Sequence, residues 1–364
     1  MEADANTLNA IIGGVQRESI DSQKEYFVKY LAEIYAASPY SLSSELSRKS
    51  ADMFENIVVG KDLKPELNNW AIYGGLTHVD GGLKDSYYGI DDQIYTTNAY
   101  GVDTESKITG TYVMGEYGLS SDLTTGVIFG VNQGESKLSN GSKVNGDNIY
   151  LGAFAKKYLG NLRLLAGVGY QYGDFEADRY SLGADKIRHY DSKYNDKTFD
   201  LYADMKYTYQ LAENLYLEPN VGISYINVEQ DSAKESGNLG MTTSSKDFNY
   251  TNLKAGVDVR KDIVTTNMKH SISTGVFYER MLAGNGEEKL EARFNSSEKT
   301  MKLLVNEKNK DKLGIRTKYE VALQNGVTFD VKGSYIFAGD NDKDNTKHKV
   351  KEEWVVGAGI GYRF

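Results

Sequence analysis

The stretch VKEEWVVGAGIGYRF, residues 350–364, decides the fold. From Trp354 to Phe364 every second residue is apolar, with aromatic side chains toward both ends, and most of the intervening residues are glycine or charged. A terminal strand with one exposed apolar face would be an unprotected edge in a soluble protein. In an outer membrane the same strand closes a barrel, with its apolar face against lipid and its other face against the lumen.

The composition is compatible with such a barrel when it is considered strand by strand. The mean hydropathy of -0.52 and the net charge of -9 are typical of a soluble acidic protein. No run reaches the roughly eighteen apolar residues of a membrane helix. Barrel strands do not raise the mean hydropathy of a chain, because every second residue of each strand faces water. The 28 tyrosines, 12 phenylalanines and 37 glycines, beside only 3 prolines, indicate strands with aromatic girdles. The absence of cysteine excludes a disulfide framework and cysteine-bound metal.

Alternating segments of the length expected for tilted membrane strands follow one another from Trp70 to Phe364. In the clearest segment, apolar residues occupy the even positions from Leu162 to Tyr172. The sequence therefore predicts an all-β protein, an antiparallel transmembrane barrel of about twelve strands. These strands are predicted at about 69–79, 105–118, 122–136, 147–158, 161–175, 197–210, 214–229, 248–261, 266–280, 312–324, 326–338 and 350–364.

The lengths of the connections provide an independent test. A barrel with both termini in the periplasm has short periplasmic turns and longer external loops. Every second predicted connection is tight, at 120–123, 159–161, 211–214, 261–266 and 324–326. The others are long and polar, at about 80–104, 137–146, 176–196, 230–247, 281–311 and 339–349. A soluble β-sandwich or barrel, the structural alternative, would not need this alternation.

Before the barrel, the apolar period changes from two residues to between three and four. Apolar residues recur at this spacing from Tyr26 to Tyr35, so residues 1–37 are predicted to be partly helical. Ser38 then reads as an N-cap and Pro39 as the first residue of a second helix.

Gly60 is a plausible stop for this second helix, which we predict at 38–61. At 1.5 Å per residue, a helix of about twenty residues is about 30 Å long and matches the thickness of a bilayer core. It is therefore long enough to thread a barrel formed by residues 69–364.

A spanning helix, a first strand that opens on WAIYGG at Trp70, and a last strand that ends in GYRF together resemble a known family. They are similar to the translocator domain of monomeric autotransporters, the type V secretion proteins, and the resemblance covers residues 38–364. It implies that helix 38–61 plugs the lumen and that residues 1–37 lead to a passenger domain on the cell surface. The implied function is export and outer-membrane anchoring of that passenger, without enzymatic activity.

The resemblance also implies partners. The BAM assembly machinery would read the terminal strand, and membrane lipid and the chain's own passenger would be the other partners of a monomer. Residues 1–10 are polar and hold no signal peptide, so we expect the chain to be the C-terminal piece of a longer exported protein. The predicted assembly signal consists of Trp354, Ile360, Tyr362 and Phe364.

Charged residues of both signs fall on the face of the strands predicted to be inward, as ionisable groups at membrane depth require water or partners. They could neutralise one another across the wall, or they could seat the helix, and both interpretations stay open. The predicted lumen-facing residues are Arg163, Asp200, Asp204, Lys206, Glu218, Lys254, Asp258, Arg260, Arg316, Lys318, Glu320, Asp330, Lys332 and Glu353. The predicted plug residues are Ser38, Pro39, Ser44, Glu45, Arg48, Lys49 and Asp52.

Motifs for other chemistry are missing from the sequence. The four histidines do not have the spacing of metal ligands, and no nucleophile elbow, phosphate-binding loop or calcium loop is present. We therefore expect no metal, no cofactor and no nucleic-acid partner. The Asn68-Asn69 pair lies beyond the helix, so we expect it to turn the chain into the barrel and not to cleave it. A diffusion porin is the alternative function, although it would not need a spanning helix.

Overall fold

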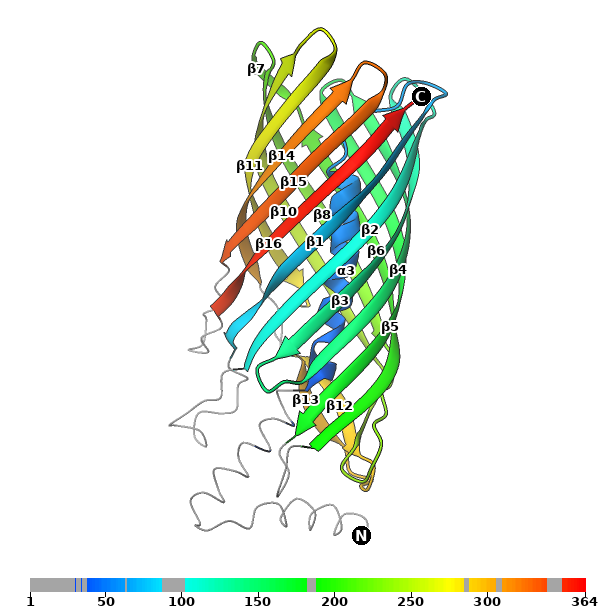
Figure 1. The fold of residues 1–364 in the computed structure, drawn as a ribbon, viewed down its shortest axis with the longest axis vertical. Coiled ribbons are helices and arrows are strands. Elements are labelled where there is room, and N and C mark those ends of the chain that lie inside the picture. The colour runs from blue at the N-terminus through cyan, green and yellow to red at the C-terminus, as the bar shows by residue number, and fades with distance from the viewer. Residues whose placement is uncertain are drawn as a thin grey trace.

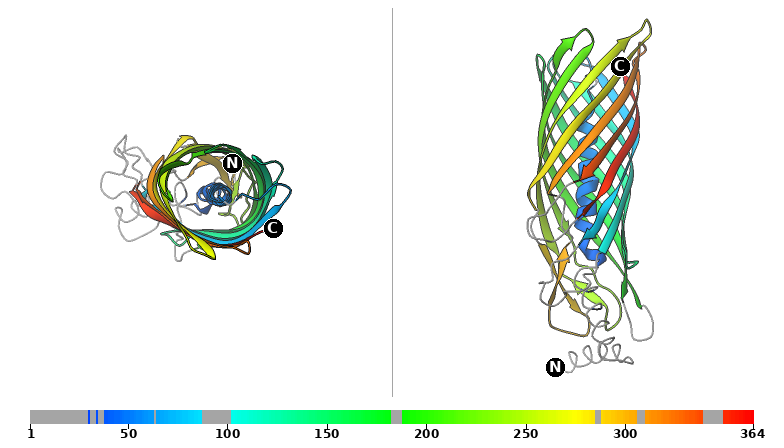
Figure 2. Two further views of the ribbon diagram at one scale, coloured as in Figure 1. Left: turned by 90° about the horizontal axis from the view of Figure 1, so that it is seen from above. Right: turned by 90° about the vertical axis from the view of Figure 1, so that its left-hand side faces the viewer.

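The computed structural model describes residue 30, residue 34 and residues 38–364, apart from 63, 87–101, 182–187, 285–287, 306–309 and 339–348. No helix in these described residues is both long enough and apolar enough to cross a membrane. The predicted segment 1–37 lies almost wholly outside them. Figures 1 and 2 show one closed barrel with a helix inside it.

The barrel wall is a single antiparallel sheet that closes on itself because β8 pairs with both β6 and β10. Its strands follow the chain around the wall, and β7, which follows β6 after residue 208, pairs with β8 as well. The prediction of an antiparallel twelve-stranded barrel with an internal helix is confirmed. The wall strands are β1 (Trp70–Ser86), β2 (Val102–Gly118), β3 (Leu123–Leu138), β4 (Lys143–Leu159), β5 (Leu162–Ser181), β6 (Arg188–Tyr207) with β7 (Tyr209–Ala212), β8 (Leu215–Gln230), β10 (Lys246–Val264), β11 (Met268–Ala283), β14 (Asp311–Leu323), β15 (Val327–Ala338) and β16 (Lys349–Arg363).

The two ends of the barrel differ, and we call them the turn end and the loop end. Both β1 and β16 have their terminal ends at the turn end, where the connections are tight and where Phe364 N–H donates to the Trp70 carbonyl at 3.0 Å. Left-handed residues make this tightness possible, with φ of 61° at Gly160 and 56° at Asn214. Asn68, at φ 62°, lies in the turn that leads into β1.

Several predicted boundaries were wrong at the loop end. β5 extends to Ser181, and β6 starts at Arg188. Most of the predicted loop 176–196 is therefore strand. The predicted long loop 137–146 is a tight turn between β3 and β4, closed by a bond from Leu138 N–H to the Ser142 carbonyl at 2.8 Å. At the turn end, the predicted turn 261–266 is wrong over residues 261–264, because β10 continues to Val264.

Three short strands lie in the connections that were predicted as loops 230–247 and 281–311. They are β9 (Met241–Thr243), β12 (Glu288–Phe294) and β13 (Met301–Val305), and they form a separate sheet in the order β13-β12-β9. We call this the mouth sheet, since Figure 1 places β12 and β13 at the loop end beside the start of the helical segment.

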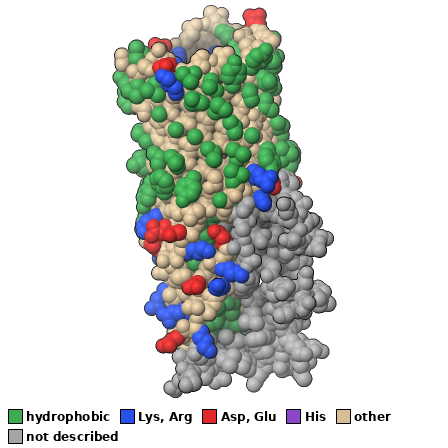
Figure 3. Space-filling view, turned by 180° about the vertical axis from the view of Figure 1, so that it is seen from behind, with side chains coloured by type: hydrophobic (Ala, Val, Ile, Leu, Met, Phe, Trp, Pro, Cys, Tyr) green, Lys and Arg blue, Asp and Glu red, His purple; other side chains and the backbone are tan. Residues whose placement is uncertain are grey.

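The strands alternate between an outer apolar face and an inner face, as the sequence predicted. Trp354, Ile360 and Tyr362 of β16, and Phe364 directly after it, point outward and are between 38% and 59% exposed. Figure 3 shows hydrophobic side chains covering the wall toward the turn end and charged side chains gathering toward the loop end. This is the pattern of a wall that meets lipid over part of its height and water beyond it.

The helical segment runs inside the barrel and begins differently from the prediction. Pro39 opens a 3₁₀ turn, η1 (Pro39–Ser41), and the α-helix α3 (Ser43–Val59) starts only after Leu42. Ser38 is the N-cap of η1 but makes no side-chain capping bond. With 17 residues, α3 is about 25 Å long and not 30 Å.

Candidate functional site in the barrel lumen

The apolar face of α3 packs against one side of the wall, from β3 to β8. Phe54 is fully buried and stacks on the Tyr150 ring with centroids 4.6 Å apart. The helix can approach this closely because glycines face it. A Cβ at Gly130 would lie 2.1 Å from the Phe54 ring, and one at Gly134 would lie 2.9 Å from Leu46. Helix and wall are therefore fitted to each other along β3.

Serines on α3 bind polar side chains of the same wall. Ser43 donates to Gln230 at 2.7 Å and Ser47 donates to Asp196 at 2.8 Å. Ser50 donates to Gln171 at 2.5 Å and accepts from Asn132 at 2.6 Å. Sequence analysis did not predict these contacts, because the partners lie more than eighty residues away along the chain. Ser44, a predicted plug residue, is buried on the same helix.

The charged residues of α3 form ion pairs both within the helix and with the wall. Arg48 is fully buried, but its guanidinium contacts Glu45 at 2.7 Å and Asp52 at 2.5 Å on the same helix. Lys49 reaches a carboxylate of the wall, Glu353 on β16, at 2.6 Å. Arg48 therefore neutralises two carboxylates at i, i+3 and i, i+4 spacings on its own helix, and its guanidinium also lies over the Tyr250 ring of β10, 5.9 Å from the ring centroid.

A second group of ion pairs lies just after α3 and surrounds Asp62. This carboxylate contacts Arg163 at 2.8 Å, Lys318 at 3.5 Å and also Lys206. Burial opposes ionisation of Asp62, but Lys206, Lys318 and Arg163 outweigh it and hold the pKa of Asp62 well below its usual range. The neighbouring Lys61 pairs with Asp330 of β15. Sequence analysis placed Lys61 at the end of the predicted helix without giving it a role, and it did not single out Asp62, which lies in a segment with no periodic pattern.

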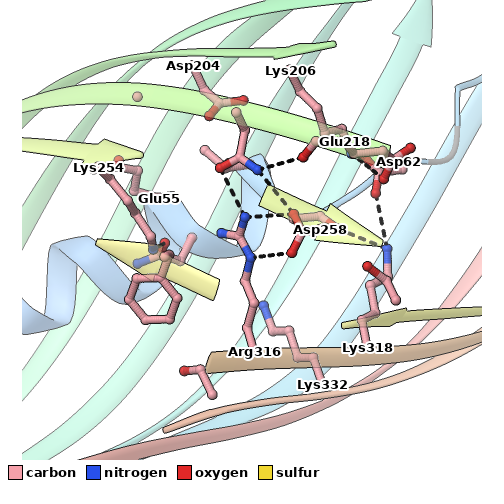
Figure 4. Close-up of a pocket in the computed structure, with 18 of the residues that line it drawn as sticks. Glu55, Asp62, Asp204, Lys206, Glu218, Lys254, Asp258, Arg316, Lys318 and Lys332 are labelled. Atoms are coloured by element: carbon pink, nitrogen blue, oxygen red, sulfur yellow. Dashed lines mark hydrogen bonds and ion pairs between the residues drawn. The ribbon is translucent and has the colours of Figure 1, made fainter. Parts of the chain in front are cut away.

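The other predicted lumen-facing residues pair within the wall or with the helix. Arg163 also contacts Asp204 at 2.8 Å, Arg260 contacts Glu218 at 3.0 Å, Arg316 contacts Asp258 at 2.7 Å, Lys318 contacts Glu320 at 3.0 Å, Asp200 accepts from Tyr150 at 3.0 Å, and Lys254 donates to Asn56 of α3 at 2.9 Å. Figure 4 shows many of these side chains converging on one space, with Lys332 among them. The described geometry thus contains both wall-to-wall and wall-to-helix pairs.

This space is a cavity of about 640 Å³ beside α3. Its lining includes Lys49 and Glu55 of the helix, Arg316 and Lys332 of the opposite wall, and Asn161 in a turn at the turn end. The lining carries charges of both signs, which is the environment that a wet lumen provides.

Replacing Asp62 with asparagine should loosen the helical segment, because three cations would lose their shared carboxylate. We expect a loss of about 1–3 kcal/mol in barrel stability, less than for a fully buried pair, since Asp62 is 38% exposed. The depressed pKa means that this stabilisation is present above the unfolded pKa, about 4, and is lost as pH falls through the folded pKa. Thermal unfolding of detergent-solubilised barrel at pH 7 and below pH 4 measures both effects.

Asp122→Asn is the matched control, because Asp122 pairs with Lys157 at 2.5 Å in an exposed turn where both side chains are 42% exposed. Its effect should be much smaller than that of Asp62→Asn, because an ion pair between exposed side chains contributes little to stability. Equal melting temperatures for Asp62→Asn and the control at pH 7 would contradict the prediction.

Comparison with known proteins agrees with this architecture. Residues 86–334 match the family model described as the autotransporter beta-domain. The chain is 26% identical, over 256 residues and 69% of its length, to the serine protease Pet autotransporter of Escherichia coli O44:H18. That alignment covers 15% of Pet, and the chain spans between 14% and 20% of the length of the curated relatives it matches.

Solved structures share the fold. The translocator domain of the autotransporter NalP from Neisseria meningitidis superimposes with a TM-score of 0.63 at 18% identity, covering 92% of this chain and all of that one. The transport unit of AIDA-I from Escherichia coli superimposes with a TM-score of 0.53 at 14% identity, covering 90% of this chain and 98% of that one.

Proposed function

Because this chain belongs to the autotransporter beta-domain family and is a translocator domain of the outer membrane, we propose that η1 and α3 join it to its own passenger. In this proposal the domain lets the passenger reach the cell surface, remains as its anchor, and is then plugged by α3. The family assignment also makes the domain a transport unit and not an enzyme.

The direction of the chain in the lumen is the observation that carries the proposal. Tyr40 lies at the loop end among residues of β6 and the mouth region, with its hydroxyl 2.8 Å from Ser192. The chain then passes along α3 to the turn end, where Leu67 bridges to Gly118 before β1 begins. A segment that enters from the loop end and leaves at the turn end is what export of upstream residues would leave behind.

Further parts of the proposal concern partners. We propose that the outward aromatic residues of β16 present the assembly signal to the BAM machinery, and that the barrel acts as a monomer in lipid. The positions of Tyr362 and Phe364 support this role. Both side chains are exposed on the outer face of the barrel, and their rings pack edge to face with centroids 4.8 Å apart.

A diffusion porin remains the alternative, and the cavity beside α3 is the observation that favours it. A porin requires an aqueous path through the whole barrel. The cavity meets the turn end, whereas the lumen at the loop end is occupied by η1 and the mouth sheet. The translocator function is therefore the better supported of the two.

Export by this domain is tested by fusing an epitope-tagged, unstructured segment before residue 1. In intact cells, protease should remove the tag, because the upstream segment leaves the barrel on the loop side. As a matched control, the same tag inserted at Gly160, in the turn between β4 and β5, should be cut only after the outer membrane is permeabilised. An N-terminal tag that stays protected while the barrel is inserted would refute the proposal.

A further inference from the structure

The plug helix does not fill the lumen. It packs mainly against β3 to β8 and leaves the cavity of about 640 Å³ between itself and the strands of the opposite wall. This cavity reaches Gly160 and Asn161 at the turn end. Among the described residues, its lining includes none from β9, β12 or β13. By itself, α3 therefore does not occupy the whole cross-section of the lumen.

The mouth sheet lies at the loop end, beside the start of the helical segment (Figure 1). Leu290, Leu303 and Met241 of this sheet are fully buried and belong to the same apolar cluster as Tyr40 and Leu42. β13 packs directly against η1. The mouth sheet therefore has an apolar core, in contrast to the charged lining of the cavity.

One carboxylate ties this region together. Glu235 is 2% exposed and accepts two hydrogen bonds from Arg179 of β5, at 2.8 and 2.6 Å. It also accepts from the Tyr40 hydroxyl at 2.8 Å and from the Met241 N–H at 2.7 Å. Wall, helical segment and mouth sheet thus meet at a single side chain.

The partners of Glu235 are themselves fixed. Arg179 is 2% exposed, lies over the Tyr190 ring at 4.4 Å, and donates to the Leu239 carbonyl at 3.2 Å. Burial and the neighbouring Glu235 raise the pKa of Tyr40 far above its usual value, so its hydroxyl keeps its proton and can donate. A buried carboxylate with these donors is held in a defined geometry. Loss of any one hydrogen bond would leave a buried polar or charged group without a partner.

We propose that Glu235 is the residue that positions the permeability seal of this barrel, and that the seal is the mouth sheet, locked by Arg179 and by the Tyr40 hydroxyl. The helix supplies only part of the closure. Because Tyr40 precedes α3, the lock is complete only when the helical segment is seated. This inference rests on the proposed translocator function and adds where and how the lumen closes after export.

The test is single-channel recording of the purified full chain in planar bilayers. Glu235→Gln should raise the mean conductance several-fold, with frequent openings, since the buried Arg179 guanidinium loses its counter-ion. Tyr40→Phe removes one donor of the set and should give shorter openings. The double change Arg179→Gln with Glu235→Gln removes both charges and should return the conductance toward that of the unmodified chain.

The matched control is Glu176→Gln on the same strand β5, whose pair with Lys193 is exposed, 53% for Glu176 and 77% for Lys193. It should conduct like the unmodified chain. Heat-modifiable migration in SDS gels establishes that each variant is folded. If Glu235→Gln does not fold, the conductance of Tyr40→Phe still tests the inference. Folded Glu235→Gln and Tyr40→Phe variants that both stay closed would overturn the inference.

Failure of this inference is distinguishable from failure of the proposed function. The seal acts after export, so the N-terminal tag should reach the surface in Glu235→Gln cells as it does in unmodified cells. A protected tag in the unmodified protein would overturn the translocator proposal. Exported tag with unchanged conductance in the folded variants would overturn only the seal.

Discussion

Replacing Tyr362 and Phe364 with serine is expected to lower the amount of barrel recovered in outer membranes by at least about tenfold. Deleting Phe364 alone should also lower the recovered amount. Both side chains lie on the outer face, 42% and 59% exposed. Each aromatic residue that moves from lipid to a polar replacement forfeits about 1.5–3 kcal/mol, and 1.4 kcal/mol corresponds to a factor of ten. Quantitative immunoblotting of outer-membrane fractions, with heat-modifiability as the sign of folding, measures the outcome.

A control separates the terminal position from the loss of aromatic area. Tyr319 of β14 is also outward and 43% exposed, so Tyr319→Ser removes a comparable ring elsewhere on the wall. It should reduce recovery only slightly, because the terminal strand is intact. Normal recovery of the terminal variants would show that this strand carries no assembly information.

The sequence predicted the twelve wall strands because their outer and inner faces meet different solvents within the membrane. Beyond the lipid this contrast disappears. β6 begins at Arg188, nine residues before the predicted start, and the outward residues there include Lys193, paired with Glu176 at 3.4 Å. Here the outward side chains are polar and the buried ones include Tyr190 and Tyr194, so the apolar-outward pattern of the lipid-facing wall is absent, and backbone pairing with β5 extends the strand.

The mouth sheet could not be predicted for a related reason. Its strands are three to seven residues long and bury their side chains on other loops. Arg179 and Glu235 are 56 residues apart, and neither stands in a motif. These two residues come together only in the folded barrel. Their ion pair is a tertiary contact, and no local sequence pattern predicts it.

Inside the lumen, the sequence predicted which side of each strand faces inward but not the partners. Strand parity places Arg316 and Asp258 on inner faces, and the register of β10, β11 and β14 then sets them 2.7 Å apart. The helix illustrates the converse. Arg48 pairs with Glu45 and Asp52 at spacings that helix geometry alone makes favourable. These two local contacts could have been predicted from the sequence, although the sequence analysis did not name them.

Removing residues 1–62 is expected to leave a folded barrel that conducts far more than the full chain and melts at a lower temperature. The wall closes on itself through β8 and β10 without help from α3, so it should still fold. Loss of the three fully buried side chains Leu46, Phe54 and Ile57 should cost roughly 5–9 kcal/mol, at about 1.5–3 kcal/mol each.

The conductance of this truncated barrel follows from geometry. A helix with side chains is about 10–12 Å wide, so its removal opens a path of that order along the wall from β3 to β8 and joins it to the existing cavity. The same deletion takes away Tyr40, one of the donors to Glu235, so the mouth sheet should loosen too. Planar-bilayer recordings should therefore rank the truncated barrel above Glu235→Gln, and Glu235→Gln above the full chain. Equal conductance of the full and truncated proteins would mean that the helical segment does not obstruct the lumen, and the porin alternative would then be preferred.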